Sequence, residues 1–460
     1  VSTGLSTLKQ HAPVIGMWGS MSIAVNSLTG PAMLDLPATF QRSGIIPTTL
    51  CLVFTCGLSA LCSLHMANTI SKVPPNNHDF SQEVEFSQAF QVFWGKRWFI
   101  ATHVIFFCCV TCLNLSSIVD TAQVVDTVIG HLVDGGSGAL HWATATDGRI
   151  HWVRWDPNQC SEEQVRDGAC VAFGGTNGIL LTSGYIVTAL VFLPMALMDL
   201  KENASWQVCG FLVLLVESVQ FAIEFVVSEI SFDNVTWWGH TWDTLFGVVL
   251  FNFALVIAIP AWLYERHPSV DVPTVIHGSS VLSTFLYILV GVLGAMSMPN
   301  VSDNMLESMM GGAFGPSMQI GACLFAFMIV GLGIPLFSVL TRMNLTGQGL
   351  GVSHSTGNAL AVYLPFGIAW LLYQGEAVTQ MLSWGGVCFT SLVAFLLPLL
   401  LALHAVQEYG DKDGVIEVYF GKFTSRESQI RVLKVLLGLA SASVAAAVIG
   451  NFVKEESNAR

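Results

Sequence analysis

The sequence predicts an all-α integral membrane protein, and three observations predict it: an apolar composition, apolar runs of membrane-spanning length, and basic residues distributed unevenly between the loops. Hydrophobic residues occupy 53% of the 460 positions and charged residues only 11%, whereas soluble proteins carry about 25% charged residues. The mean hydropathy is +0.63. This composition excludes an ordinary soluble domain. The net charge of −13 comes without a basic patch, so we expect the lipid bilayer, and no nucleic acid, as a partner.

Apolar runs of about twenty residues recur along the chain, and each could cross a hydrocarbon core of about 30 Å as one helix. We expect eleven transmembrane helices in a single domain that covers residues 1–460. Two polar segments, 132–176 and 406–431, form the larger loops. The expected spans are 14–39, 45–67, 98–119, 178–199, 206–228, 244–264, 280–299, 318–340, 358–376, 381–405 and 432–453.

The distribution of lysine and arginine predicts the orientation. A cytoplasmic N-terminus places twelve of the 18 basic residues on the cytoplasmic side, as the positive-inside rule favours. Segment 132–176 then lies on the extracellular or luminal side, and segment 406–431 in the cytoplasm. The plasma membrane and a vacuolar or lysosomal membrane both fit. The chain begins at Val1 without a methionine, which leaves open whether residues precede it, and no cleavable signal peptide is visible.

The first span contains a sequence that should interrupt its helix. Residues 26–37 read Asn-Ser-Leu-Thr-Gly-Pro-Ala-Met-Leu-Asp-Leu-Pro. Pro31 costs about 3 kcal/mol inside a helix, and Gly30 costs about 1 kcal/mol relative to alanine. A break at mid-membrane depth frees backbone groups that only protein or a water-filled cavity can satisfy. A simple proline kink is the alternative, but the neighbouring polar residues favour a binding site.

Broken spans of this kind form the substrate sites of many secondary transporters. We expect the N–H groups around Gly30 and Ala32 to bind a substrate carboxylate, because a helix N-terminus favours anions. Carbonyl groups near Ser27 and Leu28 would accept hydrogen bonds from the substrate amino group. The sixth span would supply the opposite wall. The expected substrate-binding residues are Ser27, Leu28, Thr29, Gly30, Ala32, Asn252 and Phe253.

Polar and acidic side chains inside the spans are candidates for ion coupling. A carboxylate at the bilayer centre costs about 2.5–3.5 kcal/mol, which makes Glu217 in the fifth span a functional candidate. Asp35 follows the first-span break, although it could instead lie solvated at the outer mouth. Asn26 carries a mid-membrane amide that an ion or a polar partner would explain. We therefore expect Asn26, Asp35 and Glu217 to take part in ion coupling.

Two cysteines differ from the others in their position. Cys160 and Cys170 lie in segment 132–176, whereas the other nine lie in predicted spans or at their ends. In an oxidising compartment this pair is expected to form a disulfide, with two free thiols as the alternative. The chain shows no pattern of a catalytic triad, metal cluster or phosphate-binding loop. We therefore expect no enzymatic activity, no cofactor and no metal.

The span count and the first-span motif give the chain a resemblance to the amino acid/auxin permease family of the amino acid–polyamine–organocation superfamily. In that family the first span reads roughly Asn-Ser/Thr-x-x-Gly-x-Gly/Ser-x-Leu-x-x-Pro. The matching positions here are Asn26, Ser27, Gly30, Ala32, Leu34 and Pro37. Ala32, at the second small position, and Asp35 depart from the pattern. Three further stretches are similar to the family: 193–205, 260–266 and 335–342.

The resemblance implies a leucine-transporter-like fold, in which spans 1–5 and 6–10 form two inverted repeats and span 11 is appended. It also implies secondary active transport of amino acids by alternating access. An amino-acid sensor, which binds without net transport, is the alternative from another class. A channel is disfavoured because the sequence contains no apparent filter segment.

The coupling ion implied by the resemblance depends on the eighth span. Sodium-coupled relatives place an amide in span 1 and a hydroxyl shortly before the span 8 proline. Here the residues before Pro335 are Gly331-Leu332-Gly333-Ile334, without a hydroxyl. A sodium ion would lose one of its few oxygen ligands. We therefore expect proton-coupled symport, with sodium-coupled symport as the alternative.

Overall fold

Helices make up most of the chain, as the composition predicts. The structure is a computed structural model that describes residues 14–74, 77–133, 136–142, 150–161, 172–173, 178–228, 230–242, 244–301, 304–310, 314–347, 350–373, 384–409, 415–419 and 425–458. The α-helices are α1 Met17–Leu28, α2 Leu36–Ser43, α3 Ile45–Ser71, α4 Phe86–Trp94, α5 Lys96–Leu132, α7 Ser183–Ala196, α8 Leu200–Val227, α9 Leu245–Asn252, α10 Ile259–Glu265, α11 Val272–Ser297, α12 Met305–Met310, α13 Pro316–Phe325, α14 Gly331–Thr346, α15 His354–Asn358, α16 Leu364–Leu372, α18 Leu397–Tyr409 and α19 Arg426–Asn458.

Several short segments have a different helical pitch. The 3-10 segments are η1 Pro31–Asp35, η2 Pro157–Gln159, η3 Phe232–Asn234 and η4 Leu255–Ile257. The π segments are η5 Ala326–Val330, η6 Ala359–Tyr363, η7 Gly386–Thr390 and η8 Leu392–Leu396. Each π segment continues directly into a neighbouring α-helix or into a helical residue.

Within the described residues, nine helical segments are long and apolar enough to cross a membrane. The prediction of a helical membrane protein is confirmed at this level. The two remaining predicted spans correspond to shorter elements. The first, 14–39, is divided among α1, η1 and α2, and the fourth, 178–199, contains the 14-residue helix α7.

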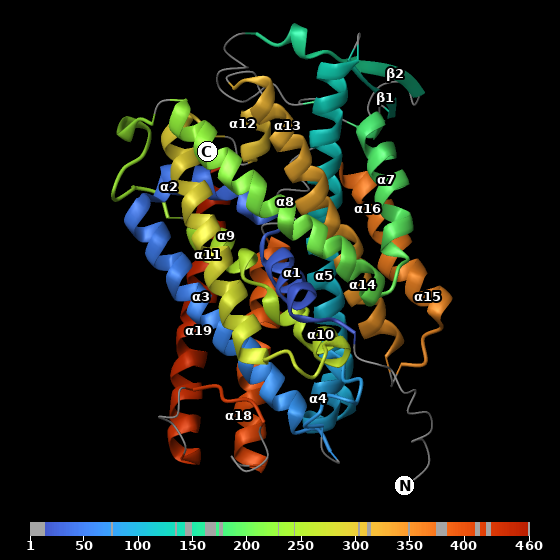
Figure 1. Cartoon of the computed structure of the whole chain (residues 1–460), viewed down its shortest axis with the longest axis vertical. Helices are drawn as coiled ribbons and strands as arrows, with labels where there is room; N and C mark the ends of the chain where they lie inside the picture. The colour runs from blue at the N-terminus through green and yellow to red at the C-terminus, as the bar shows by residue number, and fades with distance from the viewer. Residues whose placement is uncertain are drawn as a thin grey trace.

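The helices form one bundle, with a small sheet at one end and α4 at the other (Figure 1). The 37-residue helix α5 packs against α4, α7, α14 and α16. Helix α1 packs against α8 and α11. Apolar side chains such as Leu50 on α3 and Val216 on α8 are exposed. Apolar residues on the outer as well as the inner faces are typical of helices surrounded by lipid.

The first span is broken where the sequence predicts. Helix α1 ends at Leu28, and Gly30 has an extended backbone with φ −94° and ψ −160°. Pro31 opens η1, where its missing N–H has no helical partner to lose. Helix α2 then begins at Leu36. The break itself is therefore confirmed.

The sixth span is also broken, although its sequence carries no glycine–proline pair. Helix α9 ends at Asn252, and Phe253 has φ −107° and ψ 45°, outside the helical range. The segment η4 follows, and α10 begins at Ile259 with Pro260 in its first turn. Asn252 and Phe253 are expected site residues in this span, but the sequence does not predict the interruption.

The segment 132–176 and the residues after it contribute a sheet that the all-α prediction does not include. Strands β1 Ser137–Trp142, β2 Ile150–Trp155 and β3 Ile179–Thr182 pair antiparallel in the order β2-β1-β3. β-Branched and aromatic residues dominate β2, and such residues favour strands. The membrane helices agree with the all-α prediction, and the expected loop adds a small sheet at this end of the molecule.

One of the two cysteines expected to form a disulfide lies among the described residues. Cys160 is disulfide-bonded. Cys170, its expected partner, lies outside the described residues, so the pairing stays a prediction. The nine cysteines of the predicted spans are free. The loop expected over 406–431 is shorter than predicted, because α18 extends to Tyr409 and α19 begins at Arg426.

Candidate functional site

The two broken helices cross in the interior of the bundle. Helix α9 packs against η1, and α1 packs against η4, so each helix contacts the turn that follows the break in the other. Figure 1 shows α1, α9 and α10 at mid-height between the sheet and α4. The residues before both breaks, Leu28 and Asn252, are almost completely buried. Two sets of helix-terminal backbone groups therefore meet inside the protein.

At the first break, the backbone groups that the sequence assigns to substrate are bonded to each other. The Gly30 N–H donates to the Leu28 carbonyl at 2.9 Å, and the Thr29 N–H donates to the Val25 carbonyl at 2.8 Å. To bind the Gly30 N–H, a substrate carboxylate would have to displace the Leu28 carbonyl. Ala32 is the second residue of η1, and the first N–H groups of a helix have no partner within that helix.

The hydroxyl groups at this break donate within their own helix. Ser27 Oγ donates to the Ala24 carbonyl at 2.8 Å, and Thr29 Oγ1 donates to the Val25 carbonyl at 2.9 Å. Both side chains are buried. Their oxygen lone pairs can still accept a hydrogen bond. The two hydroxyls can thus serve a donor such as an ammonium group but not an additional acceptor.

Open space lies beside Gly30. A Cβ atom placed on Gly30 would meet no heavy atom within 4 Å, leaving aside its chain neighbours. By contrast, a Cβ on Gly291 of α11 would lie 2.6 Å from the Phe40 ring. The bundle is therefore closely packed near α2 but leaves room at the first break. A small ligand could approach the backbone there.

At the second break, two side chains from other helices bind the terminal carbonyls. Ser59 Oγ on α3 donates to the Phe253 carbonyl at 2.9 Å. Tyr287 Oη on α11 lies 3.3 Å from the Asn252 carbonyl. The same hydroxyl donates to the Leu28 carbonyl at 2.5 Å. Tyr287 therefore contacts both breaks.

Asn26 joins three helices through a neutral hydrogen-bond network. Its Nδ2 group donates to Gln207 Oε1 at 2.7 Å and to the Gln207 carbonyl at 2.8 Å. Gln207 Nε2 in turn donates to Asn203 Oδ1 at 2.9 Å and to the Leu332 carbonyl of α14 at 3.0 Å. Among the described residues, Asn26 Oδ1 has no hydrogen-bond partner. This oxygen is the one Asn26 atom left to serve a ligand or ion.

Glu217 lies at a distance from this network. It is on α8, about 15 Å of helix rise beyond Gln207. Its side chain is 3% exposed, and its Oε2 atom has no hydrogen-bond partner within the described part of the chain. A Cβ on Gly321 of α13 would lie 2.7 Å from that oxygen. Glu217 therefore faces α13 rather than the α1 break.

Asp35 is the last residue of η1 and directly precedes α2. It is half-buried, and its backbone carbonyl accepts a hydrogen bond from Thr39 Oγ1 at 2.9 Å. It follows Ala32 within the same 3-10 segment. Of the expected ion-coupling residues, Asp35 and Asn26 thus flank the first break, and Glu217 contacts a different helix.

Three residues of the site are not singled out by the sequence analysis: Ser59, Gln207 and Tyr287. Each is a polar side chain within an apolar span, where a polar group must find a partner in the protein. That rule is a usable signal, because intramembrane polar residues often mark functional sites. It does not say which backbone carbonyl each side chain meets.

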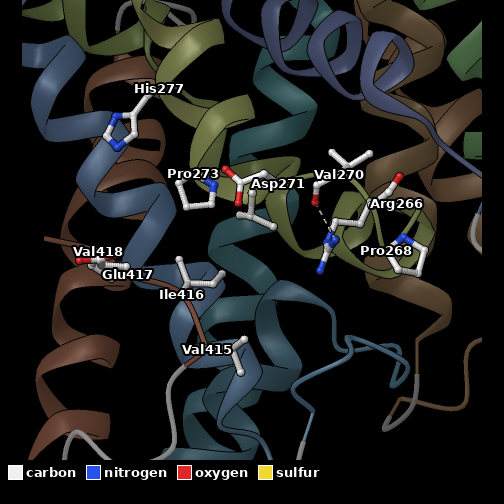
Figure 2. Close-up of a pocket in the computed structure, with 12 residues that line it drawn as sticks. Arg266, Pro268, Val270, Asp271, Pro273, His277, Val415, Ile416, Glu417 and Val418 are labelled. Atoms are coloured by element: carbon white, nitrogen blue, oxygen red, sulfur yellow. Dashed lines mark hydrogen bonds between the residues drawn. The ribbon is translucent and has the colours of Figure 1, made fainter. Parts of the chain in front are cut away.

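A separate cavity of about 540 Å³ lies beside the junction of α10 and α11. Arg266 and Asp271 line one side, and residues 415–418 lie across from them (Figure 2). Arg266 donates to the Val270 carbonyl at 2.9 Å, and burial lowers the pKa of its guanidinium. The lining residues come from the end of α10, the loop after it, the first turns of α11 and residues 415–418. This cavity is therefore distinct from the two breaks.

Comparison of the chain with known protein families gives no match, and comparison with curated proteins gives none. Within the described residues, no three or more His, Cys, Asp or Glu side chains are grouped so that they could hold a metal ion. Any statement about activity therefore depends on the geometry of the two breaks.

Proposed function

We propose that the chain is a secondary active transporter of amino acids or related zwitterions, and that it works by alternating access. The observation that carries this proposal is the packing of two interrupted helices against each other at their breaks. Discontinuous helices that meet in the middle of the bundle form the substrate sites of many secondary transporters. The apolar helices around them suit a protein that performs this task in a lipid bilayer.

A zwitterion fits the backbone groups of the first break. The Gly30 N–H donates to the Leu28 carbonyl. A carboxylate can take the N–H, and an ammonium group can take the carbonyl, both through charge-assisted hydrogen bonds that are stronger than the one they replace. The open space beside Gly30 lets an atom of the ligand approach these backbone groups. Thr29 and Ser27 add hydroxyl oxygens as further acceptors.

We propose the leucine-transporter-like arrangement of two inverted repeats plus an eleventh span. The two broken spans consist of the same succession of helical segments, which supports this proposal. Each consists of an α-helix, a short 3-10 segment and a second helix with proline at its second residue, Pro37 in α2 and Pro260 in α10. The crossed contacts of α9 with η1 and of α1 with η4 are also those of two equivalent units facing each other.

Protons are the proposed coupling ion. The Leu332 carbonyl, three residues before Pro335, accepts a hydrogen bond from Gln207 Nε2. An amide N–H thus occupies one lone pair of a backbone carbonyl near Pro335, in the span where a sodium ion would need oxygen ligands. Asp35 and Glu217 provide carboxyl groups that could carry a proton. Sodium-coupled symport remains the alternative that the experiment below separates.

The proposed orientation has a cytoplasmic N-terminus in a plasma membrane or a vacuolar or lysosomal membrane. Strands β1 and β2 lie at one end of the bundle, and the C-terminal end of α18 and the N-terminal end of α19 lie at the other (Figure 1). A protein with the loop 132–176 outside and the loop 406–431 inside requires this separation.

Uptake by the purified full-length chain in proteoliposomes tests the proposal. A mixture of radiolabelled amino acids is offered under a proton gradient in sodium-free buffer and, separately, under a sodium gradient at equal pH. We expect uptake under the inward proton gradient, and lower uptake in Asp35→Asn and Glu217→Gln. Glu224→Gln on the same helix is the control, because its side chain is not enclosed as that of Glu217 is.

Other outcomes contradict the proposal in distinct ways. Strict sodium dependence with no response to pH would replace the proton with sodium. Saturable binding of an amino acid without flux under either gradient would identify a sensor. Neither binding nor flux for any amino acid would reject the substrate class.

A further inference from the structure

One side chain, Tyr287, connects the two breaks. Its hydroxyl lies 2.5 Å from the Leu28 carbonyl and 3.3 Å from the Asn252 carbonyl. The residue is fully buried, and its ring packs edge-on against Phe253, with centroids 5.6 Å apart and ring planes at 86°. The ring is therefore held in place at the second break while the hydroxyl reaches the first.

The hydroxyl has one proton to donate, so it can make a full hydrogen bond to one carbonyl at a time. The shorter distance assigns the proton to Leu28. The Leu28 carbonyl also accepts the Gly30 N–H, so both of its lone pairs are used. A substrate ammonium can bind this carbonyl only if the Gly30 N–H or the Tyr287 hydroxyl leaves it, and the ammonium, as the stronger donor, competes with both.

We propose that Tyr287 is a positioning residue that holds the two breaks together, and that its hydroxyl transfers its hydrogen bond from Leu28 to Asn252 when a substrate ammonium binds Leu28. This inference rests on the proposed function. An ammonium group is a stronger donor to a carbonyl than a phenol is. The rotation of one O–H bond is sufficient for the change, because the second carbonyl is already within reach. Substrate binding at the end of α1 thereby adds a hydrogen bond at the end of α9.

The chain offers a matched control for this role. Tyr185 on α7 is also buried, and its hydroxyl donates to a backbone carbonyl, that of Phe366 on α16. Tyr185→Phe and Tyr287→Phe therefore remove the same chemical group from the same kind of contact. They differ in that Tyr185 is bonded to helices other than the two broken ones.

Hydrogen–deuterium exchange of the full chain in lipid nanodiscs tests the bracing role without any substrate. Tyr287→Phe should raise the exchange rates of residues 27–34 and 251–258 together by about fivefold to tenfold. The reason is that the loss of one hydrogen bond of ordinary strength increases the equilibrium constant for local opening by about that factor. Tyr185→Phe should leave both segments at the wild-type rate. Unchanged exchange in either segment, or the same increase in the control, would overturn the bracing role.

Uptake kinetics test the transfer of the hydrogen bond. With the amino acid that the wild type takes up fastest, Tyr287→Phe should lower KM several-fold, because no hydroxyl competes for Leu28, and should also lower the maximal rate. General damage to the fold would lower the maximal rate without lowering KM, and that result would overturn the transfer. A wild type that takes up no amino acid would reject the proposed function and with it the transfer, whereas the exchange experiment would still decide the bracing role.

Discussion

Gly30 has backbone angles that any residue can adopt, so strain does not require glycine at this position. Because Gly30 has no side chain, open space lies beside the first break. Because Gly30 N–H and Leu28 carbonyl are the proposed partners of the substrate, any atom placed in that space would stand between them and the ligand. A single methyl-bearing side chain should therefore affect binding before it affects folding.

Gly30→Val should reduce amino-acid uptake about a hundredfold, because displacing a ligand by even about 1 Å can have an effect of that size. Gly57→Val is the control, since Gly57 on α3 is exposed and a Cβ there also meets nothing within 4 Å. Proteoliposome uptake at equal amounts of inserted protein is the measurement. Uptake by Gly30→Val close to that of Gly57→Val would mean that the break is only a kink.

At the scale of the element, α4 shows how a short helix is fixed to the bundle by its N-terminus. Glu85 and Gln88 form a reciprocal capping box, in which the Glu85 N–H donates to Gln88 Oε1 at 2.9 Å. Ser87 in the first turn donates to Asn344 Oδ1 of α14 at 3.1 Å. Glu85 is 3% exposed. Burial, with the nearby Glu83 carboxylate as the second cause, raises the pKa of Glu85 to about 8.

The raised pKa of Glu85 predicts a loss of stability as the pH increases. The folded protein binds this proton more tightly than the unfolded chain does, so the stabilisation is complete at pH values below the unfolded pKa. It declines by up to about 1.4 kcal/mol per pH unit until the pH passes the folded value. The melting temperature of the wild type should therefore fall between pH 5 and pH 8. Thermal unfolding in detergent measures it.

Glu85→Gln is the matching variant, because glutamine keeps a side-chain oxygen for the cap and does not ionise. Its melting temperature should change less with pH than that of the wild type over the same range. Parallel curves for the two proteins would show that another group causes the pH dependence.

At the scale of the whole molecule, the topology determines which loops can meet which compartment. Strands β1 and β2 and the disulfide-bonded Cys160 lie in the large loop expected outside. A membrane-impermeant maleimide applied to intact cells should label Cys160 and Cys170 only after reduction, with mass spectrometry locating the label. Labelling from the cytoplasmic side alone would invert the topology. Labelling of both without reduction would remove the disulfide.

The break in the first span can be predicted from the sequence, whereas the break in the sixth span cannot. The break at Gly30 and Pro31 is a local effect, since the missing N–H and the low helix propensity act within one turn. The membrane spans are equally local, because their length and polarity are written in consecutive residues. The sheet is not predicted because the strand-favouring residues of β2 do not show which segments pair with it, and β3 lies within a predicted span.

The sequence by itself determined that the chain is a helical membrane protein and that its first span is interrupted, because propensity and hydropathy belong to each segment alone. Only the tertiary structure decided the second interruption and the meeting of the two breaks. Phe253 and Ala254 carry no strong helix-breaking signal. The Phe253 carbonyl leaves the helix because Ser59, from a span distant in the sequence, donates the hydrogen bond that a buried carbonyl requires. The Tyr287 hydroxyl, from another distant span, lies 3.3 Å from the Asn252 carbonyl. Such donors become available only when the helices pack.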